Sequence, residues 1–161
     1  MYKGNEMSIF IAGDPKPQAR QKFRVVKSKK TGKYMAMGYH VENKWRDKVR
    51  DFFKGRDERF DTAIKIDLHF IFNRPKNHFR TGKFSHLLKL PAKKYVTSTP
   101  DKDNLCKAVL DGMGDAGTFS NDSIVTDGRT SKRYVCKEHQ KAGVYIIINY
   151  LEDEINEQIY E

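Results

Sequence analysis

Two aspartates, Asp101 and Asp103, stand one residue apart directly after Pro100, and a third, Asp122, follows a glycine-containing stretch. If the chain folds back there, the three carboxylates meet, which is unfavourable unless a cation neutralises them. Divalent metals held by carboxylates activate water and neutralise a phosphate, as phosphodiester hydrolysis requires. Mg²⁺ prefers hard oxygen ligands and keeps several waters, so two or three aspartates suffice to hold it. Metal-dependent phosphodiester hydrolysis is therefore one interpretation of these residues.

The segment between these aspartates predicts a helix that positions them. Its apolar stripe has helical spacing and consists of Leu105, Val109, Leu110 and Met113. Asp103, Lys107 and Asp111 are four residues apart and form a separate, charged stripe. We expect the helix to end at Gly112, Gly114 and Gly117, which let the chain turn toward Asp122. Asp115 is interpreted as a residue of this turn.

A second interpretation of the same residues is structural. Asp103 is well suited to cap the helix N-terminus, although a cap explains neither Asp101 nor Asp122. Lys107 either offsets charge on a cleaved phosphate and orients the attacking water, or forms an ordinary ion pair with Asp103 or Asp111 at i,i+4 spacing. Asp111 is expected to hold Lys107 in place. The residues alone leave both interpretations open.

The run P-D-x-D-N-L-x-K-A-x-x-D at Pro100–Asp111, with an Asp after the following turn, resembles the RusA-type Holliday junction resolvases of phages and prophages. The opening I-x-G-x-P-x-P-Q-x-R at Ile11–Arg20 and the strand G-V-x-I-x-I at Gly143–Ile148 are also similar to that family. The resemblance therefore covers most of the chain. One departure is Asn121, which stands where family members often carry a second acid.

The resemblance implies a metal-dependent endonuclease that resolves four-way DNA junctions by paired symmetric nicks, in DNA recombination and repair. Asp101, Asp103 and Asp122 match the metal ligands, and Lys107 matches a catalytic lysine. The implied cofactor is Mg²⁺, with Mn²⁺ able to substitute. The implied assembly is a homodimer on branched DNA, in the cytoplasm of a bacterial host, encoded by a phage or prophage.

The charge of the chain independently favours a polyanionic partner. Its 161 residues carry a net charge of +10. Residues 16–33 hold eight Lys and Arg and residues 74–100 hold seven, with no acid in either segment, whereas residues 151–161 hold five acids and no base. The candidate DNA-binding residues are Arg20, Lys22, Arg24, Lys29, Lys30, Arg74, Lys76, Arg80, Lys83, Lys93 and Lys94. A non-catalytic nucleic-acid-binding protein that uses these basic loops is the alternative function.

Other functional classes lack their signatures. An EF-hand requires Gly and Glu at the sixth and twelfth loop positions, where Cys106 and Gly112 stand. No P-loop, G-x-S-x-G or C-x-x-C motif occurs. The two cysteines, Cys106 and Cys136, have no metal-site spacing and are interpreted as reduced thiols. No apolar run approaches the length that spans a bilayer, and no signal-peptide pattern begins the chain.

The pattern of elements predicts one α+β domain, in which two main helices pack on a mixed β-sheet. The predicted strands are 8–12, 22–27, 34–39, 64–72, 124–126 continuing toward 134–135 with an irregularity at Gly128, and 143–150. The first helix is predicted over Val41–Lys54. Strands 22–27 and 34–39 should pair as a DNA-contacting hairpin arm, and residues 74–100 should form a mobile, DNA-contacting loop.

Overall fold

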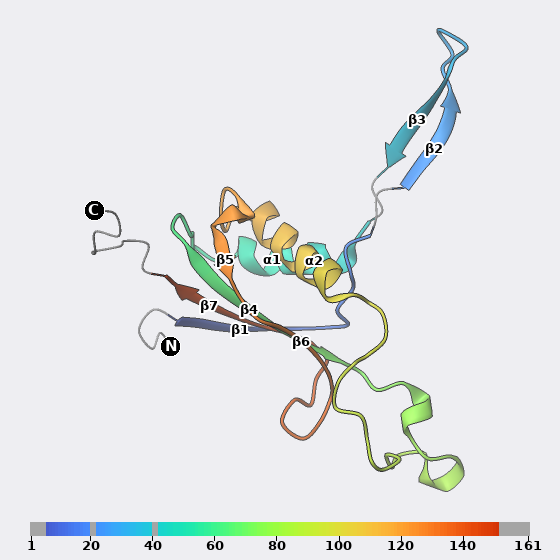
Figure 1. The fold of residues 1–161 in the computed structure, drawn as a ribbon, viewed down its shortest axis with the longest axis vertical. Coiled ribbons are helices and arrows are strands. Elements are labelled where there is room, and N and C mark those ends of the chain that lie inside the picture. Colours follow the sequence, from blue (N-terminus) through green and yellow to red (C-terminus); the bar gives the residue numbers. More distant parts are fainter. Residues whose placement is uncertain (1–5, 20–21, 40–41, 152–161) are drawn as a thin grey trace, which may run out of the picture.

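Strands rich in alternating apolar residues build a five-stranded mixed sheet, and two helices pack on one face of it (Figure 1). The computed structural model describes residues 6–19, 22–39 and 42–151. The sheet contains β1 (Glu6–Ala12), β4 (Ile64–Phe72), β5 (Val125–Asp127), β6 (Thr130–Tyr134) and β7 (Gly143–Tyr150). The strand order is β1–β7–β4–β5, and β6 also pairs with β4. The predicted α+β architecture is confirmed.

The central strands β4 and β7 supply one wall of the core. They pair antiparallel, in the register Ile66↔Ile148 and Phe70↔Val144, whereas β4 pairs parallel with β5 and β6. The buried residues of these two strands that face the helices are Ile64, Ile66, Leu68, Phe70, Val144, Ile146 and Ile148. Their alternation with less buried residues places one apolar face toward the helices, as the period-two pattern predicts.

The edge next to β4 is split into β5 and β6 at Gly128, as predicted from the sequence. Gly128 passes directly against the backbone carbonyl of Ile66, and an added Cβ would overlap that oxygen. Only glycine allows the two backbones to come this close. The glycine therefore allows the edge to stay beside β4 across the irregularity.

Helix α1 (Lys44–Lys54) begins at Lys44 rather than at Val41, which lies outside the described residues. The reason is Asn43, whose side chain accepts hydrogen bonds from the backbone N–H groups of Trp45 (3.2 Å) and Arg46 (3.3 Å). This N-cap satisfies two of the free donors at the helix start. The buried face of α1 consists of Trp45, Val49 and Phe53.

Helix α2 (Lys102–Asp115) runs through two of the glycines that were predicted to end it. Gly112 lies where α2 meets α1, and a Cβ there would lie 2.8 Å from the carbonyl oxygen of Arg46 and 2.9 Å from Cβ of Val49. Gly114 also lies inside the helix, and only Gly117, with φ +73°, makes the turn. The prediction was wrong because Gly112 serves helix packing and not termination.

No helix among the described residues is long and apolar enough to cross a membrane.

The second, two-stranded sheet is the predicted hairpin, formed by β2 (Lys22–Lys27) and β3 (Tyr34–Tyr39). Figure 1 shows it extending away from the five-stranded sheet and the helices. Large apolar side chains remain exposed on both of its faces: Phe23, Val25 and Tyr34 on one face are 64%, 72% and 73% exposed, and Met35 and Met37 on the other are 49% and 47% exposed. A two-stranded ribbon with both faces open to solvent is marginally stable alone. These features are typical of an arm that acts on a partner.

The basic segment 74–100 forms a second projection, which contains the short 3-10 turns η1 (Lys76–His78) and η2 (Gly82–Phe84) (Figure 1). Its tip is a loop closed by a bridge between Phe79 and Leu88. Backbone hydrogen bonds join Arg80 to Leu87 (2.8 Å) and Lys89 to His78 (2.9 Å). The segment therefore has an internal framework of its own, and its mobility stays a prediction.

We predict that Gly112→Ala destabilises the protein by roughly 1–3 kcal/mol, because the new methyl group overpacks the contact with α1. Gly114→Ala is the matched control: its Cβ would lie 3.6 Å from Phe119, an ordinary contact, and alanine favours the helix by up to about 1 kcal/mol. Urea denaturation of both variants measures the difference. Equal stability of the two variants would contradict close packing at Gly112.

Candidate active site

Two carboxylates at the start of α2 have no ion-pair partner among the described residues. Asp101 occupies the N-cap position, but its side chain makes no capping hydrogen bond, and Asp103 lies in the first turn. Both side chains are exposed, and neither forms an ion pair with a described residue. The capping interpretation therefore fails for Asp103, which is not the N-cap, and for the side chain of Asp101. The positive end of the helix dipole stabilises the two negative charges at this position, and their free carboxylate oxygens can serve as ligands for a hard cation.

Contacts from distant parts of the chain fix this helix start. The ammonium group of Lys132, on β6, donates hydrogen bonds to the carbonyl oxygens of Ser98 and Pro100, each at 2.7 Å. The backbone N–H of Gln18 donates to the carbonyl oxygen of Asn104 at 2.8 Å. Lys132 is a positioning residue that sequence reasoning missed. No local signal marks it, because it lies some thirty positions along the chain from the oxygens that it binds.

Lys107 lies one helical turn after Asp103, with its side chain exposed. It forms no ion pair with Asp103, Asp111 or any other described residue. Its positive charge is thus available to an external anion on the same side of the molecule as the free carboxylates.

Asp122 reaches its place through the turn after α2. The chain reverses at Gly117 and passes the fully buried Thr118. The side chain of Asn121 then accepts a hydrogen bond from the backbone N–H of Ser123 (2.9 Å), and Asp122 begins the short η3 turn (Asp122–Ile124). Asn121 therefore caps the turn that presents Asp122.

Asp101 and Asp103 both lie at the start of α2, whereas Asp122 lies beside the second half of that helix. There it lines a small pocket of about 300 Å³ with Leu110, Asp111 and Gly114. Among residues 6–19, 22–39 and 42–151, no three His, Cys, Asp or Glu side chains are placed to hold one metal ion. Like charges repel, so these three carboxylates gain from approaching one another only with a cation between them. Their joint ligation of a metal stays a prediction.

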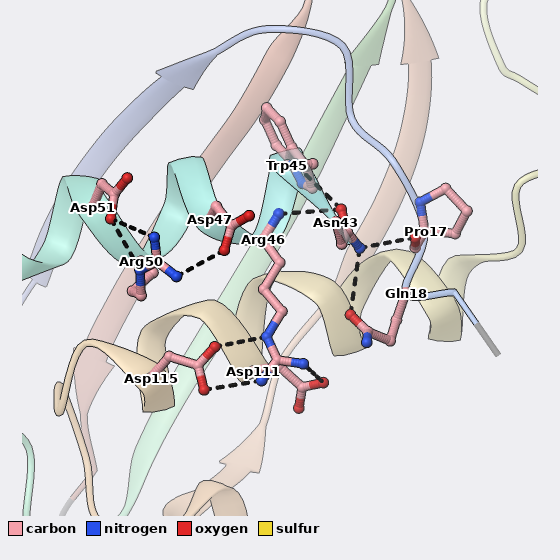
Figure 2. A network of polar contacts seen from close by, with 10 residues as sticks. All are labelled: Pro17, Gln18, Asn43, Trp45, Arg46, Asp47, Arg50, Asp51, Asp111 and Asp115. Atoms are coloured by element: carbon pink, nitrogen blue, oxygen red, sulfur yellow. Dashed lines mark hydrogen bonds and ion pairs between the residues drawn. The ribbon is translucent and has the colours of Figure 1, made fainter. Parts of the chain in front are cut away.

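Arg46 of α1 organises the acids in the second half of α2, a contact that the sequence did not reveal (Figure 2). Its guanidinium donates to both carboxylate oxygens of Asp115, at 2.6 and 2.9 Å, and to Asp111 at 3.4 Å. The structure thus gives Asp111 a partner other than Lys107 and makes Asp115 an ion-paired helix residue. The hydrogen bond from Arg46 lowers the pKa of Asp115, and the same bond raises the pKa of Arg46.

The candidate DNA-binding side chains are mostly exposed, as their proposed role requires. Exposed ones on the hairpin are Lys22, Arg24, Lys29 and Lys30, and those on the basic segment are Lys76, Arg80, Lys83, Lys93 and Lys94. Arg20 lies outside the described residues. Arg74 differs: its guanidinium donates to the carbonyl oxygens of Val135 (3.0 Å) and Lys93 (2.8 Å) and stacks over Tyr134. Arg74 thus anchors the segment, which reduces its freedom to reach DNA.

Both cysteines are free thiols, as predicted. Cys106 is partly buried, and its Sγ lies 3.1 Å from Oγ1 of Thr130 on β6. Burial raises the pKa of the Cys106 thiol, which favours its protonated, unreactive form. The thiol beside the candidate site is therefore a packing group.

Comparison with known families confirms the resemblance. A family model described as endodeoxyribonuclease RusA matches residues 12–149. The chain belongs to the RusA endodeoxyribonuclease family. The match includes α2, Asp122 and both basic segments, and it ends before the acidic tail at residues 151–161. The free carboxylates therefore lie within the RusA domain. Membership makes DNA the substrate class and places the chain among endonucleases that resolve Holliday junctions. No curated protein matches the chain.

Removing the guanidinium in Arg46→Met should lower the free energy of unfolding by about 1 kcal/mol at neutral pH, a modest loss because the pair is partly exposed. Since the pKa of Asp115 is depressed in the folded state, this contribution is present above the ordinary value of 3.8 and is lost as pH falls below it. The difference from wild type should therefore shrink between pH 6 and pH 3, as followed by urea denaturation.

Arg50→Met is the control, because Arg50 pairs with Asp47 and Asp51 on its own helix and joins no second element (Figure 2). Its effect should be smaller than that of Arg46→Met. A difference between Arg46→Met and wild type that does not change with pH would contradict the ion-pair assignment.

Proposed function

We propose that this RusA-family chain is a Mg²⁺-dependent, structure-selective endonuclease that resolves four-way DNA junctions by paired symmetric nicks. The observation that carries the proposal is the pair of free carboxylates, Asp101 and Asp103, at the start of α2 within the family match. The cellular setting proposed with it is DNA recombination and repair in the cytoplasm of a bacterial host, from a phage or prophage gene.

The donor set fits a hard divalent cation. Asp101, Asp103 and Asp122 offer exposed carboxylate oxygens, which Mg²⁺ prefers and which Mn²⁺ also accepts. When bound, the metal would polarise the scissile phosphate and lower the pKa of a bound water. Lys107, exposed and without an ion-pair partner among the described residues, would hold a phosphate oxygen of the same DNA strand. Lys132 and Gln18 would keep the carboxylates in place through their backbone contacts.

The two basic projections would hold the DNA. The hairpin and the segment 74–100 project from the body in different directions (Figure 1). Almost all of their described Lys and Arg side chains are exposed. On the segment, Lys83 lies over the ring of Phe84 and Lys94 lies over that of Tyr95. Cations beside exposed aromatic rings suit a ligand that offers both phosphates and bases. The exposed apolar side chains of the hairpin add a second surface of this kind.

The active species would be a homodimer with two-fold symmetry. Resolution requires two cuts at symmetric positions, and the chain carries one set of Asp101, Asp103 and Asp122. A four-way junction has approximate two-fold symmetry, so a symmetric pair of protomers would place one site at each cut.

We predict that Asp103→Asn abolishes nicking of a synthetic four-way junction in Mg²⁺ while its binding in Ca²⁺ stays equal or improves. The substitution keeps the side-chain shape but removes a ligand charge and some repulsion toward phosphate. Gel assays of binding and cleavage measure the two effects. Asp115→Asn, on the same helix but paired with Arg46, is the control and should keep its nicking activity. Full nicking by Asp103→Asn would favour the non-catalytic DNA-binding alternative.

The Asp103→Asn variant also tests whether the active species is a dimer. In mixtures with wild type, hybrid dimers carry one intact site and should release junctions nicked in one strand. Sedimentation from micromolar to nanomolar concentration gives the oligomeric state directly. A monomer that makes both cuts would exclude the dimer.

Charge reversal of Lys93 and Lys94 to Glu should weaken junction binding and reduce its salt dependence, because each lost phosphate contact removes about one unit of log–log slope. The melting temperature should barely change, since both side chains are exposed. Fluorescence titrations over a range of salt concentrations give the slope. An unchanged slope with a large fall in melting temperature would show that these lysines are structural.

A further inference from the structure

A pocket of about 260 Å³ lies on the face of the five-stranded sheet that α1 and α2 leave uncovered. Its strand residues alternate with the core residues of β4 and β7, so their side chains point away from the two helices. The lining consists of His69 and Ile71 of β4, Arg133 of β6, Tyr145 and Ile147 of β7, and His139 of the loop between β6 and β7. The pocket is therefore a site separate from α2 and its aspartates.

Two polar atoms that line this pocket are buried and have no hydrogen-bond partner among the described residues. They are Nε of Arg133 and Nδ1 of His139. The guanidinium of Arg133 also forms no ion pair with a described acid. A partly buried charge without a counter-charge is unfavourable, and so is a buried donor without an acceptor. An anion in the pocket would satisfy both groups.

His69 adds a third donor to the same pocket. Its Nδ1 lies 2.8 Å from Oγ of Ser131 on the neighbouring strand β6. When the hydroxyl of Ser131 donates to Nδ1, the ring carries its proton on Nε2, which is then free to donate to a ligand. The donors of the pocket therefore come from two strands and from the loop before β7.

Aromatic packing and a closed loop hold the wall of the pocket at Tyr145. The ring of Tyr145 packs against Phe10 on one side and His139 on the other, with ring centroids 4.5 and 5.2 Å apart. The backbone N–H of Cys136 donates to the carbonyl oxygen of His139 at 2.9 Å and closes the loop that carries this histidine. The imidazole of His139 is thus positioned before any ligand binds.

The charge of the pocket favours an anion and disfavours a cation. Its lining holds one guanidinium and two imidazoles and, among the described residues, no acid. Burial lowers the pKa of His69; the charge of Asp67 opposes this effect, and the charges of Arg133 and His139 add to it. Asp67 is already paired with Lys65, at 3.5 Å. A metal ion would be repelled by the guanidinium, whereas an anion would be attracted to it.

We propose that this pocket binds a phosphate group through Arg133, His139 and His69. Its volume is just below the range of about 300–1,000 Å³ that is typical of drug-sized ligands, and it suits a group as small as phosphate. Phosphate directs its oxygens to several sides, as donors from two strands and a loop require, and its geometry matches the guanidinium. The site goes beyond the proposed nuclease function, because it lies on the other face of the sheet from α2 and needs no cleavage.

The phosphate group belongs either to DNA or to a free phosphate compound. The pocket adjoins the basic segment 74–100, because Tyr95 forms a backbone bridge with Arg133. The guanidinium of Arg133 lies over the ring of Tyr95 at 5.5 Å, and the ammonium of Lys94 lies over the same ring at 5.8 Å. A DNA strand bound at Lys94 would therefore reach the pocket past Tyr95. A free phosphate compound would use the same donors without this path.

The test titrates the full chain with inorganic phosphate and follows the histidine imidazole resonances by NMR. In wild type, His69 and His139 should shift in a saturable way, whereas the exposed His86, outside the pocket, should not. Arg133→Met should weaken phosphate binding by about tenfold or more, because it removes a charge-assisted contact. Arg129→Met is the matched control: Arg129 is exposed, lies one residue before β6 and is outside the pocket, so the affinity should stay at the wild-type value.

His139→Gln, in the loop, is a second variant in case Arg133→Met does not fold, which melting temperatures show. The absence of saturable shifts in wild type would overturn the proposal whatever the variants do. Wild-type phosphate affinity in folded Arg133→Met or folded His139→Gln would also overturn it. Acetate that binds as tightly as phosphate would overturn the phosphate assignment and favour a carboxylate ligand. Chloride at matched ionic strength should produce no saturable shift.

A four-way junction identifies the source of the phosphate. If the group belongs to DNA, the junction should compete with inorganic phosphate, and Arg133→Met should reduce the log–log salt slope of junction binding by about one unit. If the source is a free compound, Arg133→Met should lose phosphate binding and keep the wild-type affinity for the junction. Neither measurement needs cleavage, so failure of the nuclease proposal and failure of this site are distinguishable.

Discussion

The packing of α2 against α1 and the sheet is the constraint on which the rest of the molecule depends. The helix buries Leu105, Val109 and Met113, and Gly112 lets its backbone come against that of α1. One face of α2 is thereby committed to the core, so Asp103 and Lys107 must lie on its open side. The helix start then serves as a rigid base for Asp101 and Asp103, as a site that binds charged groups requires.

The two ends of α2 have different electrostatic partners. At its second half, Arg46 neutralises Asp111 and Asp115 within the protein. At its first half, Asp101, Asp103 and Lys107 have no ion-pair partner among the described residues. The acids that Arg46 neutralises, Asp111 and Asp115, therefore have a structural role, whereas Asp101 and Asp103 are available to a ligand.

Much of the architecture follows from local pattern. The period-two runs predicted β4 and β7, the turn residues predicted the β2–β3 hairpin, and Gly128 marked the irregularity between β5 and β6. Two predicted helix bounds were wrong for different reasons. The start of α1 is set at Lys44 by a local cap, the side chain of Asn43, whereas α2 continues through Gly112 because of a tertiary contact with α1. The partner of Asp111 was also missed, since Arg46 lies 65 positions away along the chain.

The sequence by itself determined the family, the α+β class, the basic segments and the identity of the candidate acids, because motif spacing, periodicity and charge are properties of order along the chain. Only the tertiary structure decided which of these acids are free and what holds them. No sequence pattern identifies the roles of Arg46 and Lys132. Their partners come near only when α1 and β6 fold against α2 and the segment before it. The pocket beside Arg133 has the same origin: His69, Arg133 and His139 enclose a volume only after the sheet has formed.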